Sequence, residues 1–338
     1  MGTNEFSKAL LEWYSLNGRD LPWRHDPTPY HVAVSEFMLQ QTRVDTVIPY
    51  YERFLERFPT LEELGRSEEG EVLRYWQGLG YYSRARNLRK TAQECLKTKQ
   101  GCLPFEPEEL SSLPGIGPYM REAIRAFAFG LPAIPIDGNL IRIYARVESQ
   151  AIHPEDLKAR KAAYDYFMER IESPRDFGQA LMDLGELVCL PNGQPRCDAC
   201  PLSFCCKAHK KNQETAYPLK KAKKATPVEN LSVLLLLDGQ GNIAVRKRDS
   251  QGLLASMDEF PNARGGQEEL SNLVPGIMLR YLGKKTHVFS HVKWNMDVYT
   301  GTGIAPDYDY MPLANLKEKA ALPTAFAKLL TLLDADAR

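Results

Sequence analysis

The sequence predicts an all-α domain followed by a smaller α+β domain. Three observations support this fold class: the length, the helical spacing of apolar residues in the first two thirds, and a change of pattern after Pro218. A single hydrophobic core rarely grows beyond about 250–300 residues, so 338 residues indicate two domains. We expect them at residues 1–218 and 228–338, joined by a basic linker at residues 219–227.

Apolar residues in the first domain recur every three or four positions, which is the spacing of a helix with one buried face. Residues 44–58 and 164–171 show this spacing, and breakers such as Pro59 and Pro174 separate the periodic segments. Strand patterns are nearly absent before residue 218. The first domain is therefore predicted to be all-α.

The pattern changes at residues 219–227, where four lysines, alanines and a closing proline are typical of an exposed linker. Residues 232–238 and 243–249 then read as two strands of a hairpin around a Gly-Gln-Gly-Asn turn. Residues 286–302 predict one or two more strands, and residues 323–333 a closing helix. This combination predicts the α+β domain.

The composition is that of a globular protein. With 43% hydrophobic and 25% charged residues, it excludes disorder, collagen-like repeats and coiled coil. The aliphatic run at residues 233–237 is far too short to span a bilayer, and the N-terminal segment lacks the pattern of a secretory signal. We expect a cytoplasmic protein with no membrane partner. The 43 basic and 43 acidic residues balance, and on charge alone the local basic patches read as solvated helix faces.

Five of the seven cysteines lie between Cys189 and Cys206, which in a cytoplasmic chain favours metal binding over disulfides. A structural zinc site usually has two C-x2-C pairs, whereas this segment has one, Cys197 and Cys200. Four thiolates on one tight loop suit an iron–sulfur cluster better. Zinc and unligated thiols stay open as alternatives, and either Cys205 or Cys206 can supply the last ligand.

Residues 113–119, Leu-Pro-Gly-Ile-Gly-Pro-Tyr, predict a tight turn that leads into a helix. Gly115 and Gly117 permit the turn, and Pro118 suits the first helical position. Backbone amides at such a helix start bind anions, including DNA phosphates. The motif therefore predicts a phosphate contact.

Two carboxylates occur in unusual settings. Glu36 lies in a largely apolar helical stretch, and Asp137 follows an apolar run at the start of another helix. Apolar surroundings raise a carboxyl pKa, whereas helix N-terminal amides lower it. Two acids with opposite environments are what cleavage of a glycosidic bond requires. The alternative is a helix-face glutamate and a helix-capping aspartate.

Taken together, these features resemble the helix–hairpin–helix DNA glycosylases of the endonuclease III type, and in detail the MutY-type adenine DNA glycosylases. The resemblance covers nearly the whole chain. The matching stretches are residues 20–24, 35–42, 78–87 and 136–139 in the first domain, and 246–254 and 289–291 in the second. The second domain is similar to Nudix domains but lacks their magnesium-binding glutamates, so it should recognise rather than hydrolyse.

The resemblance implies a role for each matching residue. Glu36 would protonate the adenine at N7 and later handle the attacking water, Asp137 would stabilise the sugar cation, and Tyr119 and Asn139 would hold that site. The adenine pocket would be lined by Leu21, Trp23, Arg24 and Gln179. Gln41 and Tyr81 would wedge into the duplex near Thr42 and Leu79, and Gly115 and Gly117 would contact DNA. Phe289, Ser290 and His291 would read 8-oxoguanine. Cys189, Cys197, Cys200 and Cys206 would hold a [4Fe–4S] cluster.

The implied function is a monomeric base excision repair enzyme that removes adenine opposite 8-oxoguanine or guanine in duplex DNA, in the cytoplasm with the nucleoid. Lyase members of the superfamily carry a lysine where this chain has Tyr119, so base removal without strand cleavage is expected. Seven residues separate the first two cluster cysteines where the family has six, which keeps Cys205 open. The alternatives are a mismatch thymine glycosylase on the same scaffold and a non-catalytic lesion-binding protein.

Overall fold

The computed structural model describes residues 3–98, 101–220 and 225–336. The chain divides into two compact units, residues 1–65 with 90–222 and residues 66–89 with 223–338. The domain limits expected from the sequence stay a prediction. Lys221, Lys223 and Lys224 of the predicted linker lie outside the described residues.

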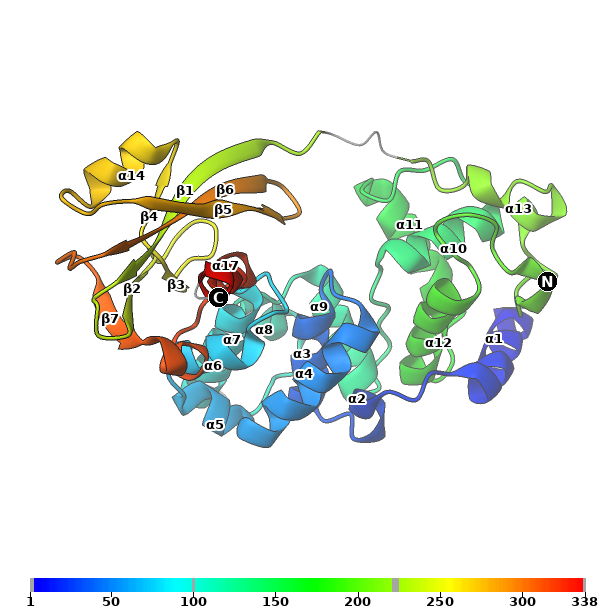
Figure 1. Ribbon diagram of the computed structural model, residues 1–338. Helices are drawn as coiled ribbons and strands as arrows, with labels where there is room; N and C mark the ends of the chain where they lie inside the picture. Colours follow the sequence, from blue (N-terminus) through cyan, green and yellow to red (C-terminus); the bar gives the residue numbers. More distant parts are fainter. Residues whose placement is uncertain (1–2, 99–100, 221–224, 337–338) are drawn as a thin grey trace. The chain divides into compact units, whose positions relative to one another are not determined.

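Up to residue 220 the described chain is helical, as the periodicity predicts (Figure 1). Its helices are α1 (Thr3–Asn17), α2 (Pro22–His25), α3 (Pro29–Leu39), α4 (Val44–Arg57), α5 (Leu61–Arg66), α6 (Glu69–Trp76), α7 (Ser83–Thr98), α8 (Pro107–Ser112), α9 (Pro118–Ala123), the π-helical turn η1 (Ile124–Ala128), α10 (Gly138–Glu148), α11 (Leu157–Met168), α12 (Pro174–Leu187), η2 (Cys197–Ala199), α13 (Lys207–Lys210) and η3 (Glu214–Ala216). Prolines at the first turns of α2, α3, α8, α9 and α12 fit positions where a backbone N–H has no helical partner.

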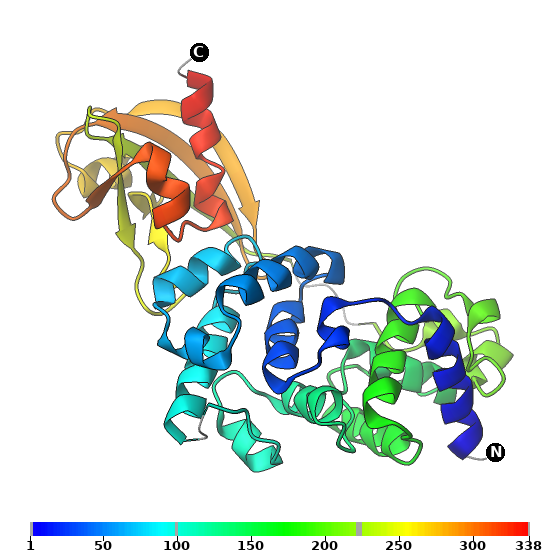
Figure 2. The same cartoon turned by 90° about the horizontal axis from the view of Figure 1, so that it is seen from below.

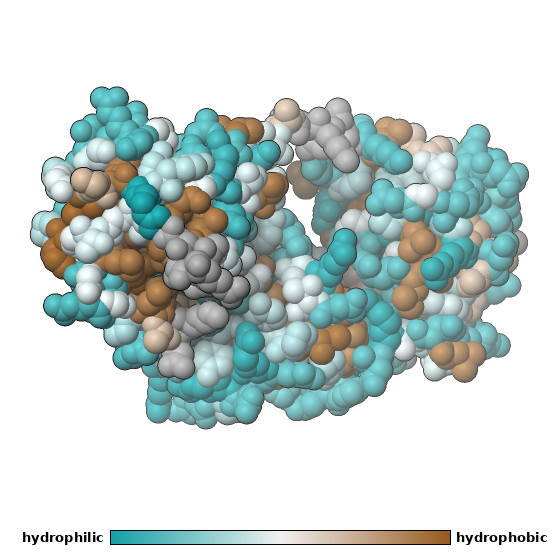
Figure 3. All heavy atoms as spheres, in the orientation of Figure 1, coloured by the Kyte–Doolittle hydropathy of each residue, from teal (hydrophilic) through white to brown (hydrophobic). Residues whose placement is uncertain are grey.

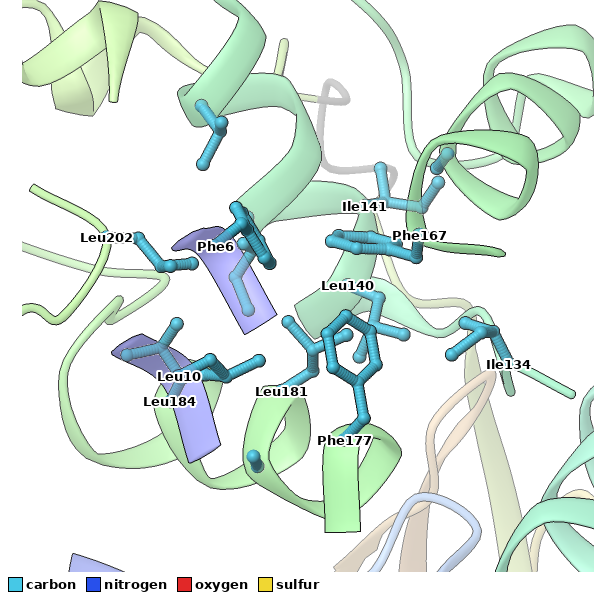
Figure 4. Packing of buried hydrophobic residues seen from close by; sticks show 14 of the residues in the cluster. Phe6, Leu10, Ile134, Leu140, Ile141, Phe167, Phe177, Leu181, Leu184 and Leu202 are labelled. Atoms are coloured by element: carbon cyan, nitrogen blue, oxygen red, sulfur yellow. The ribbon is translucent and has the colours of Figure 1, made fainter. Parts of the chain in front are cut away.

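The hydrophobic core of the first unit joins the N-terminal helix to helices far along the chain. Phe6 and Leu10 of α1 pack with residues of α10, α11 and α12, including Leu140, Phe167 and Leu184 (Figure 4). These side chains are almost completely buried, and each contributes about 1.5–3 kcal/mol by leaving water. The core holds α10 and α12 side by side (Figure 2). These two helices carry several of the site residues.

The second unit contains a mixed sheet with the strand order β3-β2-β1-β6-β5. Its elements are β1 (Val228–Leu237), β2 (Asn242–Lys247), β3 (Asp258–Glu259), β4 (Asn262–Arg264), α14 (Gln267–Leu273), β5 (Arg280–Val288), β6 (Lys293–Thr302), β7 (Asp309–Pro312), η4 (Leu313–Asn315), α15 (Leu316–Lys319), α16 (Thr324–Ala327) and α17 (Leu330–Asp336). The predicted hairpin is confirmed, since β1 and β2 pair antiparallel. β1 and β6 pair in parallel. The single closing helix predicted from the sequence is wrong in detail, because α16 and α17 are separate helices.

Strand β1 is buried on both faces, which explains its continuous apolar run. Val233 and Leu235 pack into one apolar cluster with α16, and Leu234 and Leu236 into another with α14. This alternation follows the two-residue period of a strand. On the face drawn in Figure 3, apolar residues form patches between hydrophilic ones. Within the described residues, none of the helices combines the length and apolar content needed to cross a bilayer.

Candidate active site

A cavity of about 190 Å³ in the first unit gathers the predicted catalytic residues. Every residue assigned above to catalysis or to the adenine pocket lines it, together with Thr42. These residues are Leu21, Trp23, Arg24, Glu36, Tyr119, Asp137, Asn139 and Gln179. The cavity is also lined by residues that the sequence analysis missed: Arg19, Val32, Ser35, Leu39, Val44, Phe127, Met182 and Glu186.

Glu36 is a buried residue of the apolar helix α3, with an exposed fraction of 6%. The Oη atom of Tyr119 donates a hydrogen bond of 3.1 Å to Glu36 Oε2. Burial raises the pKa of Glu36 to about 7, and the negative charge of Asp137 acts in the same direction. The Tyr119 hydrogen bond and the Arg24 charge oppose this shift. Glu36 can therefore hold or release a proton near neutral pH.

Asp137 is the N-cap of α10, and its Oδ1 accepts the Leu140 N–H at 2.8 Å. The helix amides lower the pKa of Asp137, as expected, but they do not set its net direction, so the lowered pKa expected for this residue is wrong. Burial raises the pKa of Asp137, although the backbone hydrogen bonds from Leu140 and Asn139 and the charge of Arg142 oppose it. Both acids of the pocket thus have raised pKa values, but Asp137 has more hydrogen-bond donors for its ionised form.

Helix α12 contributes a whole face to this site. Gln179, Met182 and Glu186 line the cavity and follow each other at three- and four-residue spacing. The spacing could have identified Met182 and Glu186, since the sequence analysis had already selected Gln179. Phe127 reaches the same cavity from the π-helical turn η1, a form that often marks functional positions.

The predicted wedge residues have unusual backbone conformations. Gln41 has a φ of 57° and Tyr81 a φ of 47°, both in the left-handed region that non-glycine residues rarely adopt. Each conformation costs on the order of 1–3 kcal/mol and must be held by its surroundings. Gln41 directly precedes the cavity residue Thr42, and Tyr81 is 41% exposed. Leu79 is buried.

The second unit has its own cavity of about 570 Å³. Its lining includes Tyr81, Phe289, Ser290 and His291, so the structure brings a predicted wedge residue to the predicted 8-oxoguanine reader. The Phe289 ring lies edge-on against His287 and Trp294, at centroid distances of 4.5 and 4.9 Å. This packing supports the loop that carries Ser290 and His291.

The glycine turn before α9 borders an open groove of about 790 Å³ in the first unit. Gly115 has a φ of 80°, a conformation that favours glycine, and Gly117 is the N-cap of α9. Arg121, Arg160 and Lys161 line the same groove. A turn with free space beside it and three cationic side chains can hold a phosphate.

Four of the loop cysteines line one small cavity of about 30 Å³. They are Cys189, Cys197, Cys200 and Cys206, the set that the resemblance implies. Within the described residues, Cys205 is not part of this lining, and its Sγ lies 3.3 Å from the Leu202 carbonyl oxygen. The cysteine cluster is compatible with an iron–sulfur site. His209 and Glu214 lie beside Cys197, with ligand atoms within 4.8 Å of one another.

Two buried arginines of α10 connect the cysteine loop to the catalytic pocket. Arg142 donates to the Cys189 carbonyl oxygen at 2.7 Å and to Asn139 Oδ1 at 2.7 Å. Arg146 donates to Cys189 Sγ at 3.1 Å and to the Leu190 carbonyl oxygen at 3.0 Å. The position of the loop is thereby tied to α10, whose N-cap is Asp137.

Comparison with known families matches residues 34–176 to the HhH-GPD superfamily of base excision DNA repair proteins, and residues 232–332 to the NUDIX domain. Among solved structures, a thermostable thymine-DNA glycosylase superposes with a TM-score of 0.56 at 26% identity, covering 61% of this chain and 95% of that one. Endonuclease III in a DNA complex gives a TM-score of 0.52 at 21% identity, over 63% of this chain and 98% of that one. The predicted fold class is confirmed.

Curated relatives cover both parts of the chain. The adenine DNA glycosylase of Rattus norvegicus is 33% identical over 87% of this chain and 70% of its own length. The adenine DNA glycosylase of Buchnera aphidicola subsp. Baizongia pistaciae is 37% identical over 77% of this chain and 74% of its own length. With this identity over this coverage, the chain belongs to the adenine DNA glycosylase family.

Proposed function

We propose that this protein removes adenine from duplex DNA by hydrolysing its N-glycosidic bond, and that its substrate is adenine paired with 8-oxoguanine or guanine. Family membership supports the adenine glycosylase activity. The observation that carries the mechanism is the meeting of Glu36, Asp137 and Tyr119 in one cavity. A base that is stacked in a duplex cannot reach this cavity, so the adenine must first be flipped out.

Glu36 is the general acid of the proposed reaction. With a pKa of about 7, a large fraction of this carboxyl is protonated at neutral pH. It gives its proton to N7 of adenine, and the electron pair of the bond between C1′ and N9 leaves with the base. The carboxylate so formed then takes a proton from the water that attacks C1′. The Tyr119 hydroxyl holds the Glu36 carboxyl through its hydrogen bond.

Asp137 stabilises the positive charge that develops on the sugar as the base departs. Its donors are backbone amides, which keep the charge of the carboxylate at a fixed place. Tyr119 occupies the position where a lysine would form a Schiff base, so we propose that the enzyme is monofunctional and leaves the strand intact.

The pocket wall recognises the base through apolar and amide groups. Leu21 and Trp23 are buried, and the Trp23 ring lies edge-on against the Tyr51 ring with 5.4 Å between the ring centroids. Gln179 accepts a hydrogen bond from Tyr14 Oη at its Oε1 atom, over 2.8 Å. A glutamine amide can bond two edge atoms of adenine at once, one as donor and one as acceptor.

Gln41 and Tyr81 are proposed to occupy the space that the extruded adenine leaves. Their left-handed backbones support this role, because strained residues cluster where a loop must present a side chain in one direction. Phe289, Ser290 and His291 are proposed to contact 8-oxoguanine. Cys189, Cys197, Cys200 and Cys206 would hold a [4Fe–4S] cluster, which would organise the loop at residues 189–206. We propose that the enzyme acts as a monomer in the cytoplasm, with the nucleoid.

A single-turnover glycosylase assay on duplexes that differ only in one mispair tests the proposal. Adenine opposite 8-oxoguanine should react fastest, adenine opposite guanine more slowly, and thymine opposite guanine not measurably. The matched control is the Glu36→Gln protein, which should bind the same duplexes without releasing base. Faster release of thymine would identify a mismatch thymine glycosylase, and tight binding without any release would identify a lesion-binding protein.

A further inference from the structure

Asp183 is a completely buried carboxylate that binds two arginines of the cavity lined by Glu36. It lies on α12, one helical turn after Gln179, and none of the catalytic steps above uses it. A buried carboxylate is costly unless opposite charges and hydrogen bonds compensate for the lost water. The surroundings of Asp183 supply both.

Two arginines enclose this carboxylate. Arg24 donates from Nη1 to Asp183 Oδ2 at 2.7 Å and from Nη2 to Oδ1 at 2.9 Å, a bidentate pair. Arg19 donates to Asp183 from its Nε at 2.8 Å and from its backbone N–H at 2.9 Å. Arg24 also bonds the Arg19 carbonyl oxygen at 2.8 Å. These contacts outweigh burial and hold the pKa of Asp183 below its ordinary value.

The arginines, unlike Asp183, reach the cavity. Arg19 and Arg24 line it together with Glu36. A positive charge near a carboxyl favours its ionised form, and Arg24 acts on Glu36 in this direction. The other groups that face Glu36 are Tyr119 from α9 and Asp137 from the start of α10, and Glu186 of α12 lines the same cavity. Asp183 reduces the net charge of the arginine pair from two to one.

We propose that Asp183 is a positioning residue that fixes Arg24 in the pocket wall and balances the arginine charge beside Glu36. The inference rests on the proposed role of Glu36 as the general acid. Its consequence is that Glu36 keeps its proton up to a higher pH than it would beside two uncompensated arginines. Asp183 also connects Arg24 to Gln179 through α12, so the two polar groups of the adenine pocket keep one mutual arrangement.

The test is the pH dependence of single-turnover adenine release by the Asp183→Asn protein. The loss of charge should lower the pH at which the rate begins to fall. If the shift is about one pH unit, as for a nearby charge, the loss relative to the unchanged protein should be roughly tenfold larger at pH 8.5 than at pH 5.5. Asp176→Asn is the matched control, because it removes an exposed carboxylate from the same helix and should leave the profile unchanged.

A double variant separates charge from structure and protects the test against misfolding. Asp183→Asn combined with Arg19→Gln restores the original net charge and removes one unpaired guanidinium from the protein interior. We expect its pH profile to return toward that of the unchanged protein. Asp183→Glu, which keeps the charge but moves it by one methylene, should lower the rate equally at all pH values.

The inference is wrong if Asp183→Asn lowers the rate by the same factor at every pH, or if the double variant does not restore the profile. If the Asp183→Asn protein is soluble but inactive, the pH profile of the double variant decides between the two outcomes. Failure of the proposed function would give a different result. If the Glu36→Gln protein still released adenine, Glu36 would not be the general acid. If Glu36→Gln is inactive and the profiles of the Asp183 variants do not move, only the role of Asp183 fails.

Discussion

Replacing Glu36 by glutamine should stabilise the protein at alkaline pH while it abolishes catalysis. The Glu36 pKa rises from the ordinary value of 4.5 to about 7 in the folded protein. Because the folded pKa is raised, the unfolded protein releases this proton first, so the free energy of unfolding falls between about pH 4.5 and pH 7 and changes little at higher pH. One pKa unit corresponds to about 1.36 kcal/mol. Between pH 5.5 and pH 8.5 this single group should therefore lower the stability by about 2 kcal/mol.

The Glu36→Gln protein has no such titration. Its free energy of unfolding can be measured by chemical denaturation at pH 5.5 and pH 8.5. Between these pH values it should fall by about 2 kcal/mol less than that of the unchanged protein. The Tyr119 hydroxyl can still donate to the glutamine carbonyl oxygen, so the geometry of the pocket should survive. Asp176→Asn is the matched control, because it removes an exposed carboxyl at the start of α12 without changing the size of the side chain.

Although the Glu36→Gln substitution should stabilise the protein at alkaline pH, it should strongly lower the rate of adenine release. A glutamine cannot donate the proton that adenine needs to leave, and general acid–base catalysis contributes roughly 10²–10⁴-fold. The loss should reach or exceed this range, because the same carboxyl also serves the attacking water. In the unchanged protein the rate should fall tenfold per unit above pH 7, as the protonated fraction falls. Near-normal release of adenine by the glutamine variant, measured in a single turnover, would refute this mechanism.

Three further predictions concern other parts of the chain. Cys206→Ser should reduce the bound iron and the visible absorbance of the purified protein far more than Cys205→Ser. The reverse order would identify Cys205 as the fourth ligand. Tyr119→Lys should gain strand cleavage through a Schiff base, detected as a borohydride-trapped protein–DNA adduct, and a failure to trap any adduct would show that position 119 does not reach C1′. Phe289→Ala should lower the preference for 8-oxoguanine over guanine opposite adenine in paired assays while adenine release from the guanine mispair persists, and an unchanged preference would assign recognition to other residues.

Local sequence patterns predicted the all-helical character of the first domain and the apolar setting of Glu36. The apolar stretch around Glu36 forms α3 as expected, and the glycine turn at residues 113–117 leads into α9. These features depend on neighbours in the sequence, where periodicity and turn residues carry the information. The parallel pairing of β1 with β6 was not predicted, because about 65 residues separate the strands and no local pattern encodes such a pairing.

The site was predicted unevenly for the same reason. Residue types and their settings led to Glu36 and Asp137, and the family resemblance led to Gln179, but Arg19 and Glu186 became visible only when the chain folded. Asp183 is a further example, since nothing in its sequence context distinguishes a buried charge from an exposed helix-face aspartate. The sign of the Asp137 pKa shift was wrong because capping is a local feature, whereas burial comes from the whole fold.

The two raised pKa values place a requirement on the site, because the proposed reaction needs Glu36 protonated and Asp137 ionised at the same time. In a coupled pair of acids, the first negative charge goes to the group whose ionised form receives more hydrogen bonds. Asp137 receives the amides of Leu140 and Asn139, whereas Glu36 receives the single hydroxyl of Tyr119. Once Asp137 is ionised, its charge makes the second ionisation harder and helps to keep the proton on Glu36. The N-cap of α10 therefore favours ionisation of Asp137 before Glu36, which is the order that the tasks proposed for the two carboxyls require.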